Sequence, residues 1–242
     1  ATDIDGDGLT YSAKSSSAGV AATVSKDTLT LTPAANWNGT STITAYASDG
    51  TLKDSTTFTL SVTAVNDAPV ITAVANDSTN EETEKALKLN TTDVDGDALT
   101  YSASSDTSGV GVTISSDTLR LMPALNYTGT AKITVIVSDN ALTDTTSFTF
   151  KVINVNDAPV IAAVSDVTFA EDTTGSLVLS ATDIDGDGLT YSAKSSIADV
   201  GTTVSKDTLT LTPAANWNGT STITAYASDG TLKDSTTFTL SV

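Results

Sequence analysis

Neither cysteine nor histidine occurs among the 242 residues. Without cysteine the chain has no disulfide, thiolate nucleophile or zinc–thiolate site, and without histidine it lacks the usual general base and the usual transition-metal ligand. Pairs of acidic residues could in principle hydrolyse glycosides. Every acidic cluster here lies in a repeated turn rather than in a unique cleft, so we expect no catalytic function.

Basic residues are also scarce. The chain has 11 Lys and Arg against 29 Asp and Glu, a net charge of −18, and a single arginine, Arg120. We therefore expect nucleic acids and anionic membranes to be poor partners, and cations to be the natural ligands. No segment resembles a signal peptide or is apolar over a membrane-spanning length, so we predict no membrane insertion.

What the chain does have is a repeat of 90 residues. The sequence Asp-(Ile/Val)-Asp-Gly-Asp begins at Asp3, Asp93 and Asp183, and Val-Asn-Asp-Ala-Pro begins at Val65 and Val155. Residues 1–62 and 181–242 differ at only four positions, namely Ser17/Ile197, Gly19/Asp199, Ala21/Gly201 and Ala22/Thr202. The period predicts three domains, 1–62 (which lacks its first strands), 63–152 and 153–242.

Within each repeat, short runs rich in Thr, Val, Ile and Leu alternate apolar with polar residues, as in Thr222–Ala227 and Thr236–Val242. Period-two alternation predicts half-buried strands, and turn residues separate about seven such runs per repeat. The pattern predicts an all-β fold, a tandem array of seven-stranded Greek-key β-sandwiches whose first copy is incomplete. No stripe of helical period is present.

The acidic turn places three carboxylates at alternate positions around a glycine, which suits a hard cation with oxygen ligands, calcium above all. An EF-hand loop begins in the same way, but its twelfth position needs a bidentate Glu, and here Lys14, Ser104 and Lys194 stand there. We therefore reject an EF-hand. The alternative is that these acids only solvate turns, which Asp, Asn and Gly favour in any case.

Four features together resemble a cadherin repeat; along the chain they are the linker Val155-Asn-Asp-Ala-Pro159, Glu171, Ala181-Thr-Asp-Ile-Asp185 and Tyr226-Ala-Ser-Asp229-Gly. The bacterial cadherin-like (tandem-95 type) repeats of large surface adhesins are similar over the whole unit. The resemblance implies cadherin/Ig-like sandwiches with Ca²⁺ shared at each junction between repeats. The animal cadherins carry two further acids near the positions of Asn36, Asn126 and Asn216, so we expect fewer ions or weaker sites here.

The resemblance implies a set of ligands for each junction. At the first junction they are Asn66, Asp67, Asp93, Asp95 and Asp139, and at the second they are Glu81 or Glu82, Asn156, Asp157, Asp183, Asp185 and Asp229. Asp97 and Asp187 are additional candidates. The matching residues of the first repeat are Asp3, Asp5, Asp7 and Asp49, whose upstream linker is absent from this chain.

These inferences predict an extracellular, cell-surface or secreted protein whose repeats are calcium-stiffened extenders that hold an adhesive domain away from the cell. The partners are then the neighbouring repeats of the same chain. One alternative is a self-assembling filament or sheath subunit, in which an identical chain donates the missing strands. Another is a carbohydrate-binding or adhesive module that uses the loops around Trp37 and Trp217, although an aromatic residue there more often closes the end of a sandwich.

Overall fold

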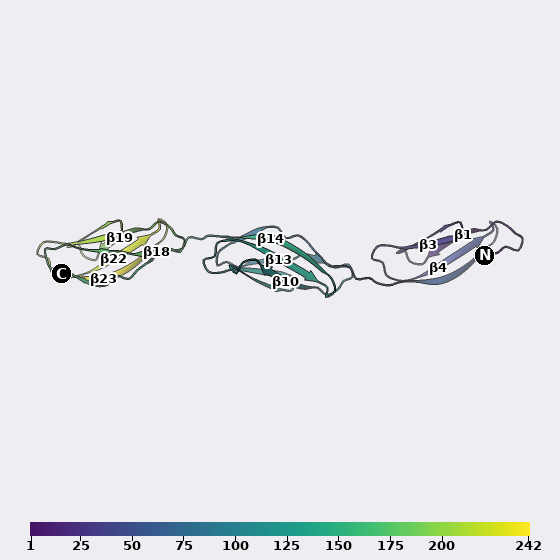
Figure 1. Ribbon diagram of the computed structural model, residues 1–242, viewed down its shortest axis with the longest axis horizontal. Coiled ribbons are helices and arrows are strands. Elements are labelled where there is room, and N and C mark those ends of the chain that lie inside the picture. The colour runs from purple at the N-terminus through teal and green to yellow at the C-terminus, as the bar shows by residue number, and fades with distance from the viewer. The chain divides into compact units, whose positions relative to one another are not determined.

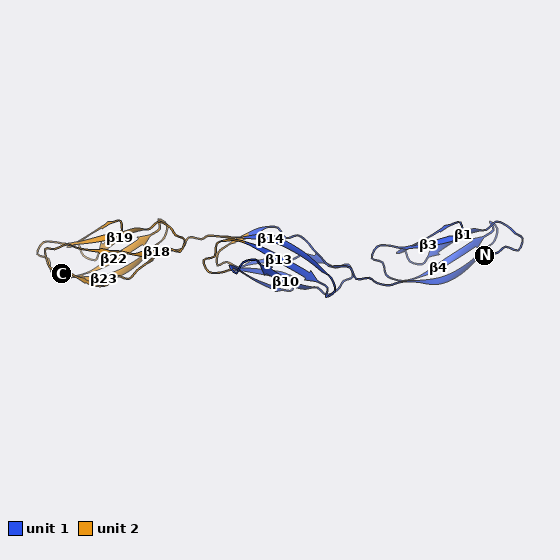
Figure 2. Ribbon diagram, in the orientation of Figure 1, with its two compact units in different colours: residues 1–77, 84–122, 131–150 blue, residues 78–83, 123–130, 151–242 orange.

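The computed structural model describes all 242 residues, and every regular element is a β-strand (Figure 1). The fold is the predicted all-β tandem array of sandwiches, with a partial first copy. No helix is present that could cross a membrane. By internal contacts the chain divides into two units (Figure 2), the first formed by residues 1–77, 84–122 and 131–150 and the second by residues 78–83, 123–130 and 151–242.

The first repeat lies wholly in unit 1. Its two sheets have the strand orders β1-β4-β5 and β2-β3. The strands are β1 Thr10–Ser15, β2 Val20–Ser25, β3 Thr28–Pro33, β4 Gly39–Ser48 and β5 Lys53–Val62.

The second repeat has two principal sheets, ordered β10-β13-β14-β7 and β11-β12-β8, and a short pair, β6-β9. The strands are β6 Val70–Ile71, β7 Asp77–Asn80, β8 Lys85–Lys88, β9 Thr91–Thr92, β10 Thr100–Ser105, β11 Val110–Ser115, β12 Thr118–Pro123, β13 Gly129–Ser138 and β14 Thr143–Ile153. Most of this repeat belongs to unit 1, but the β7–β8 and β12–β13 connections belong to unit 2.

The third repeat lies in unit 2 and has the same arrangement, β16-β23-β22-β19 against β17-β21-β20, with the short pair β15-β18. The strands are β15 Val160–Ile161, β16 Val167–Thr168, β17 Gly175–Val178, β18 Ala181–Thr182, β19 Thr190–Ser195, β20 Val200–Ser205, β21 Thr208–Pro213, β22 Thr220–Ser228 and β23 Lys233–Ser241.

Alternation along the strands builds the core. In β21 and β23, alternate residues such as Leu209, Leu211 and Leu240 are fully buried, while the intervening threonines face outward or are half-buried. The alternating segment 176–181 divides into β17, which pairs with β21, and β18, which pairs with β15. The chain therefore crosses from one sheet partner to another within six residues, and this crossing brings the acidic turn that follows β18 to the end of the sandwich nearest the preceding linker.

Candidate metal centre

The third repeat's acidic turn, Asp183 to Asp187, is organised by its first carboxylate. Asp183 Oδ1 accepts the backbone N–H groups of Asp185 at 3.0 Å and Asp187 at 3.3 Å. Gly186 adopts a φ of 79°, which a glycine reaches at little cost. The second oxygen of Asp183, Oδ2, is buried and takes no part in these bonds.

The linker is fastened to this turn and to the end of β22. The Asp157 N–H donates to Asp185 Oδ2 at 2.7 Å, and Asn156 Nδ2 donates to Asp229 Oδ2 at 2.8 Å. Asp229 Oδ1 also accepts the N–H of Leu232 at 2.6 Å. The Asn156 amide, followed by the backbone N–H groups, lowers the pKa of Asp229, since all these donors favour the charged carboxylate.

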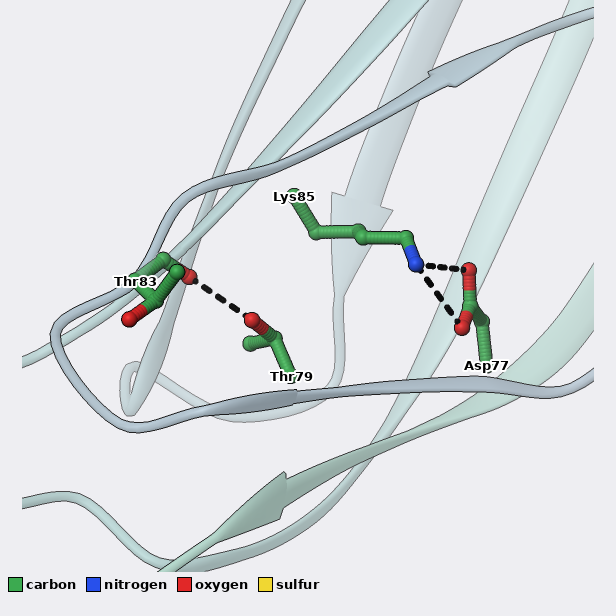
Figure 3. Close-up of polar contacts among 4 residues, drawn as sticks. All are labelled: Asp77, Thr79, Thr83 and Lys85. Carbon is green, nitrogen blue, oxygen red and sulfur yellow. Dashed lines mark hydrogen bonds and ion pairs between the residues drawn. The ribbon is translucent and has the colours of Figure 1, made fainter. Parts of the chain in front are cut away.

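The second repeat contributes acids from the connection between β7 and β8. Two contacts brace this connection (Figure 3): Lys85 Nζ lies 2.9 Å from Asp77 Oδ2, and Thr79 Oγ1 donates to the carbonyl oxygen of Thr83 at 3.2 Å. Glu81 lies in the same connection and is only 5 % exposed.

Of the two glutamates predicted as alternatives, Glu81 contacts the linker directly. Its Oε1 accepts the Val155 N–H at 2.6 Å, and its own N–H donates to the carbonyl oxygen of Ile153 at 3.0 Å. The adjacent Glu82 has a φ of 57° and contacts Asn126 instead. The sequence did not distinguish their roles because both glutamates stand at the tip of one connection.

Carboxylates from the second repeat, the linker and the third repeat therefore converge. Oxygens of Glu81, Asp157 and Asp185 lie within 4.8 Å of one another, and so do those of Asp183, Asp185 and Asp187. Asp185 belongs to both groups. Burial, and then the negative charges of Asp185, Glu82, Glu81 and Asp183, raise the pKa of Asp157. No salt bridge of the chain uses any of these carboxylates, so the negative charge is not balanced by protein groups.

A second observation indicates a ligand. Asp183 Oδ2 and its counterpart Asp93 Oδ2 are buried and have no hydrogen-bond partner. A buried carboxylate oxygen without a partner costs free energy. An oxygen-only donor set with one buried, unsatisfied oxygen fits a hard cation such as Ca²⁺. The residues that would hold it are the two groups that share Asp185.

At the first junction, in unit 1, the contacts between the linker and the repeat that follows it recur. Asp67 N–H donates to Asp95 Oδ2 at 2.8 Å, and Asn66 Nδ2 donates to Asp139 Oδ2 at 2.8 Å. Oxygens of Asp93, Asp95 and Asp97 lie within 4.8 Å of one another. Backbone N–H groups, led by that of Leu142, together with the Asn66 amide lower the pKa of Asp139. The counterparts of Glu81 and Glu82 would precede residue 1 and are not in this chain.

The predicted residues of the first repeat form the turn but not a cluster. Asp3 Oδ1 accepts the N–H groups of Asp5 at 2.9 Å and Asp7 at 3.2 Å, as at the other two turns. Asp49 Oδ1 accepts the N–H groups of Thr51 and Leu52, and these bonds lower its pKa. The oxygens of these acids do not form a close group of three.

One residue that was not among the predicted ligands contacts the acids of the second junction. Asn126, in the β12–β13 connection, contacts both Glu82 and Asp157 through its side-chain amide. The sequence showed a neutral residue here. Only the folded loops show what it contacts.

The tryptophans of the alternative adhesive surface are both half-buried. Trp217 packs against the core of the third repeat. Trp37 lies so close to Gly19 that a Cβ built there would stand 2.2 Å from the ring. The third repeat has Asp199 in the place of Gly19, so the two rings, although they share a local sequence, sit in different surroundings.

Two family profiles match the chain. The bacterial Ig domain matches residues 66–151 and 156–242, and the cadherin-like domain matches residues 1–63. Tandem domains of these kinds are typical of surface and secreted proteins. The three matched segments follow one another along the chain. No curated protein matches the chain in sequence.

Several solved structures are similar over most of the chain. An endo-fucoidan hydrolase of glycoside hydrolase family 107 is 24 % identical over 97 % of this chain, with a TM-score of 0.35, and this chain spans 38 % of that protein's length. A protocadherin gamma cis-dimer is 17 % identical over the whole chain and 70 % of its own, with a TM-score of 0.49. An I-band fragment of titin is 15 % identical over 96 % of this chain and 87 % of its own, with a TM-score of 0.41. The family profiles, rather than these distant likenesses, identify the repeats.

Proposed function

Because this chain belongs to the bacterial Ig domain family and begins with a cadherin-like repeat, we propose that it is a run of calcium-stiffened extender repeats from an extracellular surface adhesin. In this proposal the repeats hold an adhesive domain away from the cell and have no catalytic role of their own. The near-identity of the first and third copies supports a spacer, since a spacer gains length by duplication and needs no new site.

The observation that carries the proposal is the buried, unpartnered carboxylate oxygen that recurs at Asp93 and Asp183. Turn-forming acids with no further role need only their first oxygen, which accepts the backbone N–H groups. The second oxygen could equally have faced water. Its burial without a partner is unfavourable unless a cation completes the site.

At the second junction the three contributing segments would be joined through one ion site. Glu81 comes from the second repeat, Asp157 from the linker and Asp185 from the third repeat. Without a cation these carboxylates repel one another, which favours a mobile linker. Bound Ca²⁺ would offset that repulsion, and the same residues would then restrain the linker against both repeats.

The affinity of such sites agrees with an extracellular location. Calcium sites in extracellular modules have dissociation constants on the order of 10⁻⁴ to 10⁻³ M. In about 10 mM calcium, binding at one such site stabilises the folded state by about 1.4 to 2.7 kcal/mol. Sites of this strength are filled only where calcium is abundant.

The test compares two double substitutions in the same local sequence. Asp183→Ala with Asp185→Ala removes the turn acids at the second junction, whereas Asp3→Ala with Asp5→Ala removes their counterparts where no linker carboxylate is present. Each is made together with Trp37→Phe, so that Trp217 alone reports thermal unfolding of the third repeat. Each is measured with calcium and with EDTA, together with the maximum particle dimension by small-angle scattering.

We expect calcium to raise the melting temperature of the third repeat and the average particle length in the parent protein and in the Asp3/Asp5 variant. The Asp183/Asp185 variant should lose most of both effects. If calcium and EDTA give the same melting temperature and the same scattering curve for the parent protein, the proposal is wrong.

A further inference from the structure

The first repeat has two sheet edges that are covered in the third repeat. In the third repeat β16 pairs in parallel with β23, and β17 pairs in antiparallel with β21. In the first repeat the matching strands, β5 and β3, stand at the ends of their sheets without these partners. We call these two free edges and the side chains between them the open side. A free edge carries unpaired N–H and C=O groups, so it is a template for a further strand.

Apolar side chains are left partly in water on the open side. Phe58 is 43 % exposed, whereas its counterpart Phe238 is 4 % exposed. Three leucines that are only half-buried in the first repeat have fully buried counterparts in the third, and they are Leu29, Leu31 and Leu60. Burial of such side chains is favourable, so the open side is suited to a covering segment.

The third repeat shows what covers this surface. Segment 160–180 contains β15, β16 and β17, and its Leu179 is only 1 % exposed. Val167, Phe169 and Leu177 of the same segment pack against the core of the repeat. The residue next to Leu179 faces the other way, since Val178 is 67 % exposed. The segment therefore binds by alternate apolar residues as well as by main-chain pairing.

The surface that receives this segment has the same sequence in both repeats. The pairing residues 208–211 and 240–241 of the third repeat are repeated without change at 28–31 and 60–61. The four differences between the copies all fall within residues 17–22 of the first repeat. The open side thus keeps every main-chain pairing position that β16 and β17 use.

Side-chain contacts to the segment can also recur. In the third repeat Asp234 Oδ2 accepts the Ile161 N–H at 3.0 Å, and the first repeat has Asp54 in the place of Asp234. At the first junction a cavity of about 290 Å³ is lined by residues that include Trp37 and Val65. Val65 corresponds to Val155, whose N–H is bound by Glu81 of the β7–β8 connection. Segment 160–180 has a glutamate at the position of Glu81, so the cavity has room for a carboxylate that the segment brings.

We propose that the open side of the first repeat is a docking site for one extended peptide segment with the apolar pattern of residues 160–180, supplied by another polypeptide. The segment pairs with β5 and β3 by β-strand addition and buries alternate apolar side chains. The two segments of this kind in the chain, 70–90 and 160–180, already belong to the second and third repeats. A second copy that donates one of them uncovers a repeat of its own, so exchange between copies gains no buried surface. The partner is therefore a polypeptide whose matching segment is not already paired.

The experiment uses the full chain and a synthetic peptide of residues 160–180. Two matched peptides carry the same change at neighbouring positions, Leu179→Asp at the buried one and Val178→Asp at the exposed one. Binding is measured by calorimetry in EDTA, so that the result does not depend on calcium. Thermal unfolding of the first repeat is followed by Trp37 fluorescence in a Trp217→Phe chain, and that of the third repeat by Trp217 fluorescence in a Trp37→Phe chain.

We expect one peptide to bind per chain and to raise the melting temperature of the first repeat but not of the third. The Leu179→Asp peptide should bind more than about a hundredfold more weakly, because it places a charge in an apolar core. The Val178→Asp peptide should bind within about threefold of the parent peptide. Absence of binding, equal binding of the two matched peptides, or stabilisation of the third repeat alone overturns the inference.

Sedimentation of the chain without peptide tests the other occupant. We expect a monomer at every concentration, since a second copy has no spare segment to donate. A dimer that the peptide does not dissociate would show that a second copy holds the open side, and it would likewise overturn the inference.

Discussion

The first and third repeats have almost the same sequence and differ in how deeply they bury it. Phe58 is 43 % exposed, whereas its counterpart Phe238 is 4 % exposed. In the third repeat β16 pairs with β23 and β17 pairs with β21, and the first repeat has no counterpart of either strand. The difference shows that the shared strands supply the apolar side chains, and that the segment preceding these strands in the third repeat buries them.

The acids show the same contrast. The turns that begin at Asp3 and Asp183 form the same first hydrogen bonds, yet only the second turn meets a linker and gathers into close carboxylate groups. Identical residues therefore do not make identical sites. The candidate metal centre is a property of the junction and of no single repeat.

The largest expected contrast concerns the core. Phe238→Ala should destabilise the third repeat by about 3 to 5 kcal/mol, because it opens a cavity in a covered core, whereas Phe58→Ala should cost the first repeat about 1 kcal/mol. The chain has two tryptophans, one in each of these repeats. Urea unfolding followed by fluorescence, with Trp37→Phe or Trp217→Phe, separates the two transitions. Equal losses in the free energy of unfolding would show that the difference in exposure between the two phenylalanines does not affect stability.

The second and third repeats differ in the side-chain contacts at the same sheet edge. We expect substitutions there to change stability by an intermediate amount. In the second repeat Lys85 pairs with Asp77, and in the third a Cβ added to Gly175 would stand 1.8 Å from the Phe169 ring. Gly175→Ala should displace that ring and cost about 1 to 3 kcal/mol. Lys85→Ala, which breaks a half-exposed ion pair, should cost about 1 kcal/mol or less. Calorimetry on each variant checks the order, and a reversed order would contradict this account of the edge.

The smallest effect concerns pH. The pKa of Asp229 is lowered first by the Asn156 amide, whereas the pKa of Asp49 is lowered by backbone N–H groups alone. A carboxylate whose folded pKa is lowered contributes stability that is present above its unfolded pKa and is lost as pH falls through the folded pKa. In calcium-free buffer, Asn156→Ala should raise the pKa of Asp229 and leave that of Asp49 unchanged. Carbon-detected NMR titration of the side-chain carboxyls measures both, and equal shifts would exclude a specific role for Asn156.

Much of the fold could be predicted from the sequence because it depends on local alternation. The residues Leu209, Leu211, Ile223 and Phe238 stand at alternate strand positions, and all four are buried. The two-residue strand β16 was not predicted, since a segment so short has no periodicity to detect. Its existence depends on the neighbouring strand β23, which lies some 70 residues further along the chain.

The candidate site could be predicted in outline for a similar reason. Acids at fixed spacing in a repeated turn indicate oxygen ligands whatever the fold around them. The choice of Glu81 over Glu82 as the residue that contacts the linker, and the contacts of Asn126, depend on how two loops with left-handed residues meet. Sequence spacing does not determine side-chain direction in such loops.

The most direct test of the account is a crystal structure of the chain grown in calcium, with the ion identified by its anomalous scattering. We predict an ion 2.3 to 2.6 Å from Asp183 Oδ2, the usual distance for calcium–oxygen ligands, and a second at the matching Asp93 Oδ2. Calcium at neither oxygen, in crystals grown well above the expected dissociation constant, would contradict the claim that the junctions are metal sites.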